Sequence, residues 1–163
     1  MTRIIMHGCN GKMGQVISGL LAADQEAEIV AGVDAFDDGH NAYPVFKKLE
    51  ECKVDADCII DFSAAAAVDG LLDYCEERKI PCVLCTTGLS PEQLERVREV
   101  SEKVAILRSA NMSIGINLLQ QILKKAADVL APAGFDIEII EKHHNLKVDA
   151  PSGTALALAD SIN

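Results

Sequence analysis

The chain has few aromatic and few basic residues. Only 4% of its 163 residues are aromatic and tryptophan is absent, so aliphatic side chains must build the core that a 49% hydrophobic composition can support. Its 25 acidic and 15 basic residues give a formal net charge of -10, which argues against nucleic acid and anionic membrane surfaces as partners. No apolar run reaches the length of a membrane span, and the first residues lack the layout of a signal peptide. We therefore expect a cytoplasmic protein.

The six cysteines do not form a convincing site. Cys82 and Cys85 make a C-x-x-C pattern, which can indicate a redox or zinc site. They lie in an apolar run typical of a strand, in which positions three apart point to opposite faces. We therefore predict reduced, mostly buried thiols and no metal site.

Strand and helix patterns alternate through the first two-thirds of the chain. Parallel strands need crossover helices, so this order predicts an α/β domain over residues 1–113, with a Rossmann-like, doubly wound parallel sheet. Ser90 and Gln93 form a capping box around Pro91 at the start of one helix. Strands are expected at 3–7, 28–33, 57–62, 81–85 and 104–109, and helices at 13–22, 64–78 and from 91.

Residues 114–163 have longer elements. An amphipathic helix is expected over 114–130, with Ile114, Leu118 and Ile122 on one side. A strand is expected over 135–140, and a last helix begins at Ser152.

A glycine-rich segment follows the first strand. Gly8, Gly11 and Gly14 are spaced as G-x-x-G-x-x-G at a strand-to-helix turn, where the backbone can approach a pyrophosphate and the helix N-terminus supplies N–H donors. Asp34 ends the next strand, where a carboxylate accepts hydrogen bonds from an adenine ribose. This context predicts dinucleotide binding; the alternative is a structural turn with an incidental aspartate.

The charges near this segment bear on the choice of cofactor. The Asp34 carboxylate repels a 2′-phosphate, and the two residues after it, Ala35 and Phe36, supply no positive charge to offset this. Lys12, in contrast, lies within reach of such a phosphate. We expect NADH or NADPH, with NADH favoured. No role is assigned to His7 or His40.

A basic segment stands out in this acidic chain. His143, His144 and Lys147 come shortly before a Pro-Ser-Gly-Thr helix start at 151–154, where unpaired N–H groups and the helix dipole favour an anion. Asp149 either orients a basic neighbour or shapes the turn before Pro151. The alternative for the whole segment is a charged surface loop capped by Ser152.

Residues 141–155, Glu-Lys-His-His-Asn-Leu-Lys-Val-Asp-Ala-Pro-Ser-Gly-Thr-Ala, together with the glycine loop, resemble the dihydrodipicolinate reductase family. Its signature is Glu-x-His-His-x-x-Lys-x-Asp-Ala-Pro-Ser-Gly-Thr-Ala, and every defined position is matched. The resemblance implies an NAD(P)H-dependent reductase that transfers hydride to a cyclic dicarboxylic imine on the route to diaminopimelate and lysine. It further implies that residues 114–163 begin an α+β substrate and oligomerisation domain, and that the full-length fold is a homotetramer.

The resemblance also implies roles for individual residues. His143 would be the general acid, with Lys147 as its partner. The implied substrate-binding residues are His144, Lys147, Ser152, Gly153, Thr154 and Thr87. The implied cofactor-binding residues are Gly8, Cys9, Asn10, Gly11, Lys12, Met13, Asp34, Phe62, Cys85, Thr86, Thr87, Ala110, Asn111, Met112 and Ser113.

The chain departs from the family pattern in places. Cys85 replaces the usual glycine of Gly-Thr-Thr-Gly, and Met112 replaces an aromatic residue. Chains of the family continue beyond the signature helix to complete a mixed sheet. A second function therefore stays open: a truncated, non-catalytic dinucleotide-binding or redox-sensing module, which needs the glycine loop but not the basic segment.

Overall fold

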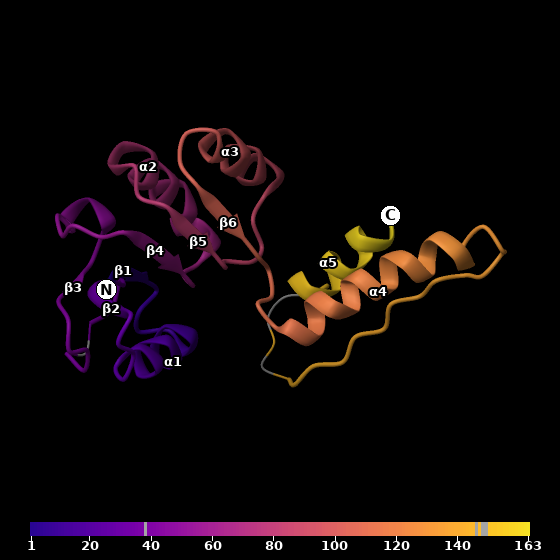
Figure 1. Ribbon diagram of the computed structural model, residues 1–163, viewed down its shortest axis with the longest axis horizontal. Helices are drawn as coiled ribbons and strands as arrows, with labels where there is room; N and C mark the ends of the chain where they lie inside the picture. The colour runs from indigo at the N-terminus through magenta and orange to yellow at the C-terminus, as the bar shows by residue number, and fades with distance from the viewer. Residues whose placement is uncertain (38, 146, 148–149) are drawn as a thin grey trace. The chain divides into compact units, whose positions relative to one another are not determined.

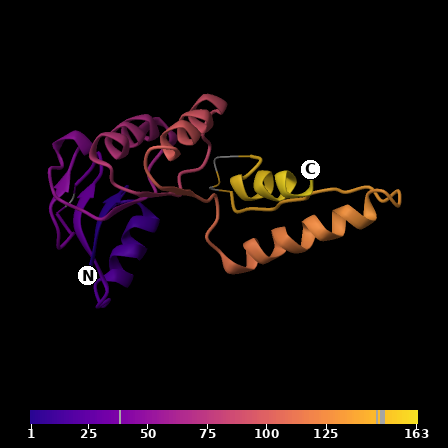
Figure 2. The same ribbon diagram turned by 45° about the horizontal axis from the view of Figure 1, so that its top comes forward.

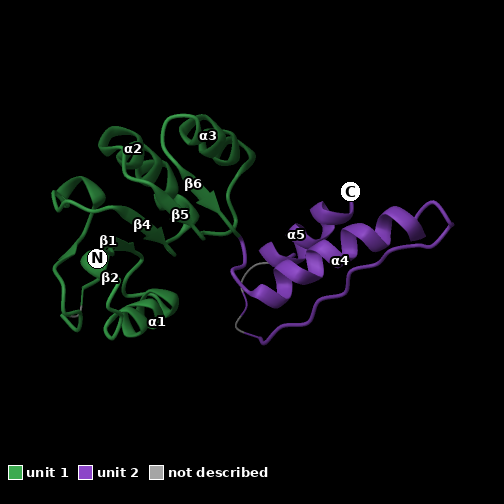
Figure 3. Ribbon diagram, viewed as in Figure 1, with its two compact units in different colours: residues 1–109 green, residues 110–163 purple. Residues whose placement is uncertain are grey.

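The computed structural model describes residues 1–37, 39–145, 147 and 150–163. These residues form two compact units, unit 1 over Met1–Ser109 and unit 2 over Ala110–Asn163 (Figure 3). The division falls at the start of the segment 109–113, which joins the last strand of unit 1 to the first helix of unit 2. The sequence places its domain boundary at the end of the same segment.

Unit 1 is built on a six-stranded sheet in the order β3-β2-β1-β4-β5-β6, in which every neighbouring pair is parallel. The predicted Rossmann-like α/β fold is confirmed. The short strand β3 lies in a segment that the sequence left irregular, because two residues carry no detectable period. The strands are β1 (Thr2–His7), β2 (Ala27–Val33), β3 (Val45–Phe46), β4 (Cys58–Asp61), β5 (Cys82–Leu84) and β6 (Ile106–Arg108).

In the described residues of unit 1, α-helices cover both faces of the sheet. α1 (Lys12–Leu21) lies on one face, and α2 (Val68–Arg78) and α3 (Pro91–Ser101) lie on the other (Figure 1). The capping box at α3 is confirmed, since Gln93 N donates to Ser90 Oγ at 3.2 Å and Ser90 N donates to Gln93 Oε1 at 3.1 Å. Single turns of 3₁₀-helix, Leu49–Glu51 and Ala65–Ala67, precede β4 and α2.

The core of unit 1 lies between the sheet and the layer of α2 and α3. Ile5, Ile59 and Leu84 from the strands pack with buried side chains of the two helices, among them Leu72 and Val100. Burying one such side chain stabilises the fold by about 1.5–3 kcal/mol. Aliphatic residues thus supply the core, as the low aromatic content requires. All six cysteines are free thiols, and all except Cys58 are buried.

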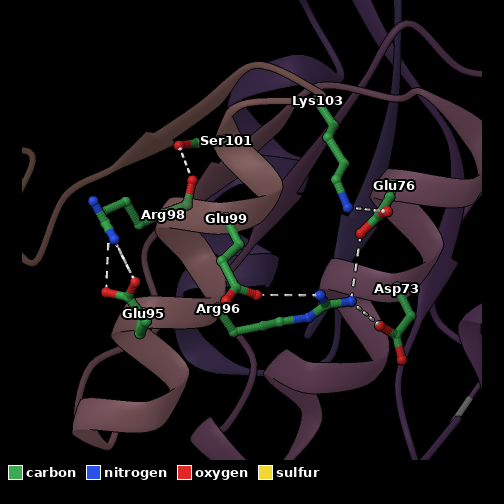
Figure 4. Close-up of polar contacts among 8 residues, drawn as sticks. All are labelled: Asp73, Glu76, Glu95, Arg96, Arg98, Glu99, Ser101 and Lys103. Atoms are coloured by element: carbon green, nitrogen blue, oxygen red, sulfur yellow. Dashed lines mark hydrogen bonds and ion pairs between the residues drawn. The ribbon is translucent and has the colours of Figure 1, made fainter.

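Ion pairs join α2 to α3 on the solvent side of this layer (Figure 4). Arg96 of α3 lies 2.9 Å from Asp73 and 3.4 Å from Glu76 of α2, and Lys103 lies 2.7 Å from the same Glu76. Pairs as exposed as these contribute about 0–1 kcal/mol each, so the apolar core provides most of the stability of this packing.

Among the described residues of unit 2, helix α4 (Ile114–Leu130) contacts helix α5 (Gly153–Ile162). α4 has the predicted bounds, and Ser152 is the N-cap of α5, with its Oγ accepting from Ala155 N at 3.1 Å. The segment between the helices returns toward the start of α5 (Figures 1 and 2). In the part of the chain that the structure describes, no helix has the length and apolar character needed to cross a membrane.

The strand expected over 135–140 is not formed. Phe135, Ile137 and Ile139 alternate with polar residues, but the whole segment is exposed and has no regular structure. A strand needs a neighbour to satisfy its N–H and C=O groups. No other described segment pairs with these residues, so the prediction of a strand is wrong for this chain.

Candidate functional site

The glycine loop fits closely against the end of β4. Gly8 has φ +79°, and a Cβ atom on it would lie 2.6 Å from the backbone oxygen of Phe62. A Cβ atom on Gly14 would meet the backbone oxygens of Gly8 and Cys9. Only glycine combines this conformation with this approach, so the loop keeps the start of α1 close to the sheet edge.

The N-terminus of α1 presents free backbone donors. Gly11 is the N-cap, and no described side chain caps this end. Gln15 N donates to Gly11 O at 3.0 Å, which closes the first helical turn. The N–H groups of Lys12, Met13 and Gly14 therefore have no partner within the helix. Together with the helix dipole they form a site suited to a phosphate group.

A cavity of about 360 Å³ opens beside this loop. Asp34 lies on its wall, and its carboxylate accepts from Asn10 N at 3.0 Å and from Phe36 N at 3.1 Å. Lys47 also lines the cavity, because it directly follows β3, whose residue Phe46 pairs in register with Val33 before Asp34. The sequence assigned Lys47 no role, since this register cannot be read from local patterns.

Two predicted cofactor residues use their side chains to hold the loop itself. The Asn10 amide donates to Phe36 O and accepts from Asn41 Nδ2 at 2.6 Å, which ties the loop to the segment after β2. The Cys9 thiol is buried, and burial, with the charge of Asp34, raises its pKa to about 11. Cys9 and Asn10 can therefore meet a ligand mainly through their backbone.

The ends of β1, β4 and β5 meet in a buried polar network. His7 Nδ1 lies 2.8 Å from Asp61 Oδ1, and Thr86 Oγ1 donates to Asp61 Oδ2 at 2.5 Å. Burial acts to raise the pKa of Asp61, but the hydrogen bonds from His7, Ser63 and Thr86 and the interaction with the His7 charge hold it below its ordinary value.

The predicted residues Phe62, Cys85 and Thr87 adjoin this network along the chain. Thr87 is exposed and Phe62 is half-buried. Burial raises the pKa of the Cys85 thiol to about 11.

The basic segment of unit 2 is organised around Glu141, which the sequence left without a role. Its Oε1 accepts from Ser152 N at 2.9 Å. Its Oε2 is buried without a hydrogen-bond partner among the described residues, and His143 Nδ1 lies 3.6 Å from it. The bond from Ser152 lowers the pKa of Glu141, and the charges of His143 and Lys147 add to this effect. Glu141 thus connects the start of α5 to the predicted general acid.

Asn111 joins the same group of residues. Its Nδ2 donates to Thr154 Oγ1 at 3.0 Å, so a predicted cofactor residue contacts a predicted substrate residue within unit 2. Ser113 caps α4, and its N–H donates to Asn111 Oδ1 at 2.9 Å. Further along, Lys147 N donates to His144 O at 3.2 Å. Ala110 and Gly153 are half-buried and Met112 is exposed, while Asp149 lies outside the described residues.

Two other cavities are lined by none of the predicted site residues. One of them, of about 510 Å³, lies between α1, the start of β2 and residues 40–43. Among the described residues, no group of three or more histidine, cysteine, aspartate or glutamate side chains is arranged to hold a metal ion.

Comparisons with known proteins match the whole chain. The family model described as dihydrodipicolinate reductase, N-terminus, matches residues 2–112, and the one described as dihydrodipicolinate reductase, C-terminus, matches residues 115–163. The 4-hydroxy-tetrahydrodipicolinate reductase of Caldanaerobacter subterraneus is 54% identical over 163 residues, and that of Clostridium novyi is 52% identical over 162. The matches cover 100% and 99% of this chain, which spans 64% of the length of each relative.

Solved structures agree with the sequence matches. The dipicolinate-bound dihydrodipicolinate reductase from Paenisporosarcina sp. TG-14 has a TM-score of 0.76 and 32% identity, covering 99% of this chain and 65% of that one. The scyllo-inositol dehydrogenase of Lactobacillus casei with bound NAD(H) and scyllo-inositol has a TM-score of 0.59 at 14% identity, covering 77% and 42%, and is similar in fold alone. The chain belongs to the dihydrodipicolinate reductase family.

Proposed function

We propose that the whole protein is a 4-hydroxy-tetrahydrodipicolinate reductase. It transfers hydride from NADH or NADPH to a cyclic dicarboxylic imine, with loss of water, and forms tetrahydrodipicolinate for diaminopimelate and lysine biosynthesis. The observation that carries this proposal is 54% identity over all 163 residues to a relative of that name. The complete signature over 141–155 supports the catalytic form over the non-catalytic dinucleotide-binding module.

The residues of unit 1 fit a nicotinamide dinucleotide. The free N–H groups at the start of α1 suit its pyrophosphate, and Gly8 leaves room for a close approach of the backbone. The Asp34 carboxylate has lone pairs left after its two backbone bonds, which suit a ribose diol. NADH is favoured, because Asp34 opposes a 2′-phosphate, although Lys12 and Lys47 partly offset that repulsion.

The residues of unit 2 fit a dicarboxylic substrate. Ser152 N already donates to Glu141, and Ala155 N to the Ser152 cap, which leaves the N–H groups of Gly153 and Thr154 for a carboxylate. Asn111 orients the Thr154 hydroxyl. His144 and Lys147 hold the other end of the substrate, and Thr87 of unit 1 is assigned to the substrate as well.

The chemical step needs a hydride and a proton. A bound reduced nicotinamide supplies the hydride. His143 supplies the proton as general acid, with Lys147 positioning the substrate and stabilising developing charge. Glu141 Oε2 lies 3.6 Å from His143 Nδ1, close enough to form an ion pair with the protonated imidazole.

We expect the protein to act in the cytoplasm as a homotetramer. Six free thiols suit a reducing compartment, and the net charge of -10 suits neither nucleic acid nor an anionic membrane as a partner. The oligomeric state is carried over from the family and can be checked by light scattering on the full-length protein.

The proposed function is tested by measuring the rate at which the full-length protein consumes NADH after the cyclic imine is added. Lys125→Ala on exposed α4 is the matched control for Lys147→Ala, because each removes one lysine side chain. We expect turnover in the wild type and the Lys125 variant, and a large loss in the Lys147 variant. NADH binding without any imine-dependent turnover would support the non-catalytic module instead.

A further inference from the structure

His7 takes part in a network that none of the predicted roles explains. It ends β1 and lies in register with Asp61 at the end of the neighbouring strand β4. Thr86 follows β5, the next strand in the sheet. The three side chains meet through the 2.8 Å contact between His7 and Asp61 and the 2.5 Å bond from Thr86 to Asp61. Their exposed fractions are only 6%, 0% and 5%, so solvent cannot replace either bond.

The bonding of Asp61 fixes the direction of each donor. An ionised carboxylate can only accept, so His7 Nδ1 carries the proton in its bond to Oδ1. Ser63 N also donates to Oδ1 at 3.2 Å, and the Thr86 hydroxyl donates to Oδ2. Thr86 therefore has its hydroxyl proton turned toward Asp61, and its rotamer depends on Asp61 staying ionised and in place.

The network borders the cavity beside the glycine loop. His7 and Ser63 line that cavity together with Gly8 and Gly11. At its other end, Thr86 directly precedes the exposed Thr87. The network thus connects the wall of the dinucleotide cavity to Thr86 and Thr87, which the family resemblance assigns to the cofactor. Thr87 is assigned to the substrate as well, and because hydride passes from the nicotinamide to the substrate, a residue that contacts both lies at the nicotinamide end.

We propose that His7 is a positioning residue for the nicotinamide end of the cofactor. Its bond to Asp61 holds the carboxylate that orients Thr86, and so fixes the Thr86–Thr87 segment against which the nicotinamide ring binds. This inference rests on the proposed function, because it requires a nicotinamide cofactor in unit 1. The adenosine half is held separately by Asp34 and the start of α1, for which no bond to the network is found among the described residues.

This separation gives the proposal a selective test. Removing the His7 donor leaves the buried Asp61 short of a partner, and Thr86 loses its fixed orientation. NADH carries the nicotinamide ring and ADP-ribose does not. If His7 positions the nicotinamide end, replacing it weakens NADH binding and leaves ADP-ribose binding unchanged. General destabilisation would weaken both.

The experiment measures dissociation constants of NADH and ADP-ribose for the full-length protein. The variants are His7→Ala, which removes the donor, and His7→Asn, whose amide nitrogen takes about the place of Nδ1. We expect His7→Ala to weaken NADH about tenfold, the equivalent of ~1.4 kcal/mol for one lost bond to a charged group. His7→Ala should bind ADP-ribose as tightly as the wild type does, and His7→Asn should restore NADH binding.

Each other result has a definite meaning. Equal NADH binding by His7→Ala and wild type overturns the inference, as does an equal loss of both ligands or a failure of His7→Asn to restore binding. Should His7→Ala not fold, Thr86→Val and Thr86→Ser decide: the inference requires selective loss of NADH in the first and its retention in the second. A wild type that binds neither NADH nor NADPH overturns the proposed function itself.

Discussion

Replacing Gly8 by alanine tests the close fit of the glycine loop on which the cofactor site depends. The backbone at φ +79° costs a residue with a side chain about 1–2 kcal/mol. The new Cβ would also lie 2.6 Å from Phe62 O and 2.8 Å from Phe62 C, and relieving such overpacking costs a further ~1–3 kcal/mol. We therefore expect Gly8→Ala to lower the free energy of unfolding by about 2–5 kcal/mol.

Two glycines of the same unit separate these terms. Gly88 has φ +74°, but no atom lies within 4 Å of the position that its Cβ would take, so Gly88→Ala should cost only the conformational ~1–2 kcal/mol. Gly19 lies inside α1 with nothing within 4 Å, so Gly19→Ala should stabilise the protein by about 0.5–1 kcal/mol. Urea denaturation of the three variants measures the free energies, and NADH titration should show lost affinity for Gly8→Ala. Equal costs at Gly8 and Gly88 would refute the close contact with Phe62.

Further predictions concern the cofactor, the reaction and pH. NADH should bind at least as well as NADPH because of Asp34; a clear NADPH preference that Lys12→Ala abolishes would show that the two charges were ranked wrongly. His143→Ala should lower kcat by about 10²–10⁴-fold, and Lys147→Ala should lower kcat and raise KM. The affinity for NADH should be unchanged in both variants. Near-normal turnover in both would show that this segment does not belong to the active site. Hydrogen bonds from the Arg3 side chain and backbone, together with its charge, lower the pKa of Asp57 from 3.8 to about 2. The stabilisation of the folded protein by the Arg3–Asp57 pair is therefore fully present above the ordinary pKa of 3.8. It is lost as pH falls through the lowered pKa of about 2. Urea denaturation at several pH values gives the difference in free energy of unfolding between the wild type and Asp57→Asn. This difference should shrink as pH falls from 3.8 toward 2; a difference that stays constant would contradict the pairing.

Local signals in the sequence determine much of this fold. The apolar spacing over Ile114–Leu130 and the capping box at Ser90 and Gln93 act within a few residues, and both predictions are confirmed. The alternation at 135–140 is equally local, yet no strand forms there. A strand depends on a neighbour, and periodicity indicates only which faces a segment would have once it is paired.

The candidate site could be predicted from the sequence only in part. The glycine spacing and Asp34 lie at one sheet edge because strand–turn–helix order places them there. The contact of His7 with Asp61 depends on the register of β1 against β4, and the place of Lys47 depends on the pairing of β3 with β2. Such registers follow from packing across the whole sheet, so no pattern in the flanking residues reveals them.

Isotope transfer by the full-length protein tests whether it reduces the cyclic imine with hydride from NADH. NADH carrying deuterium on the transferable position of its nicotinamide ring is mixed with the cyclic imine, and the product is examined by mass spectrometry. The product should gain deuterium, and NAD⁺ should form in equal amount, because hydride passes directly from cofactor to substrate. NADH that binds and stays reduced, with no labelled product, would contradict the proposed function.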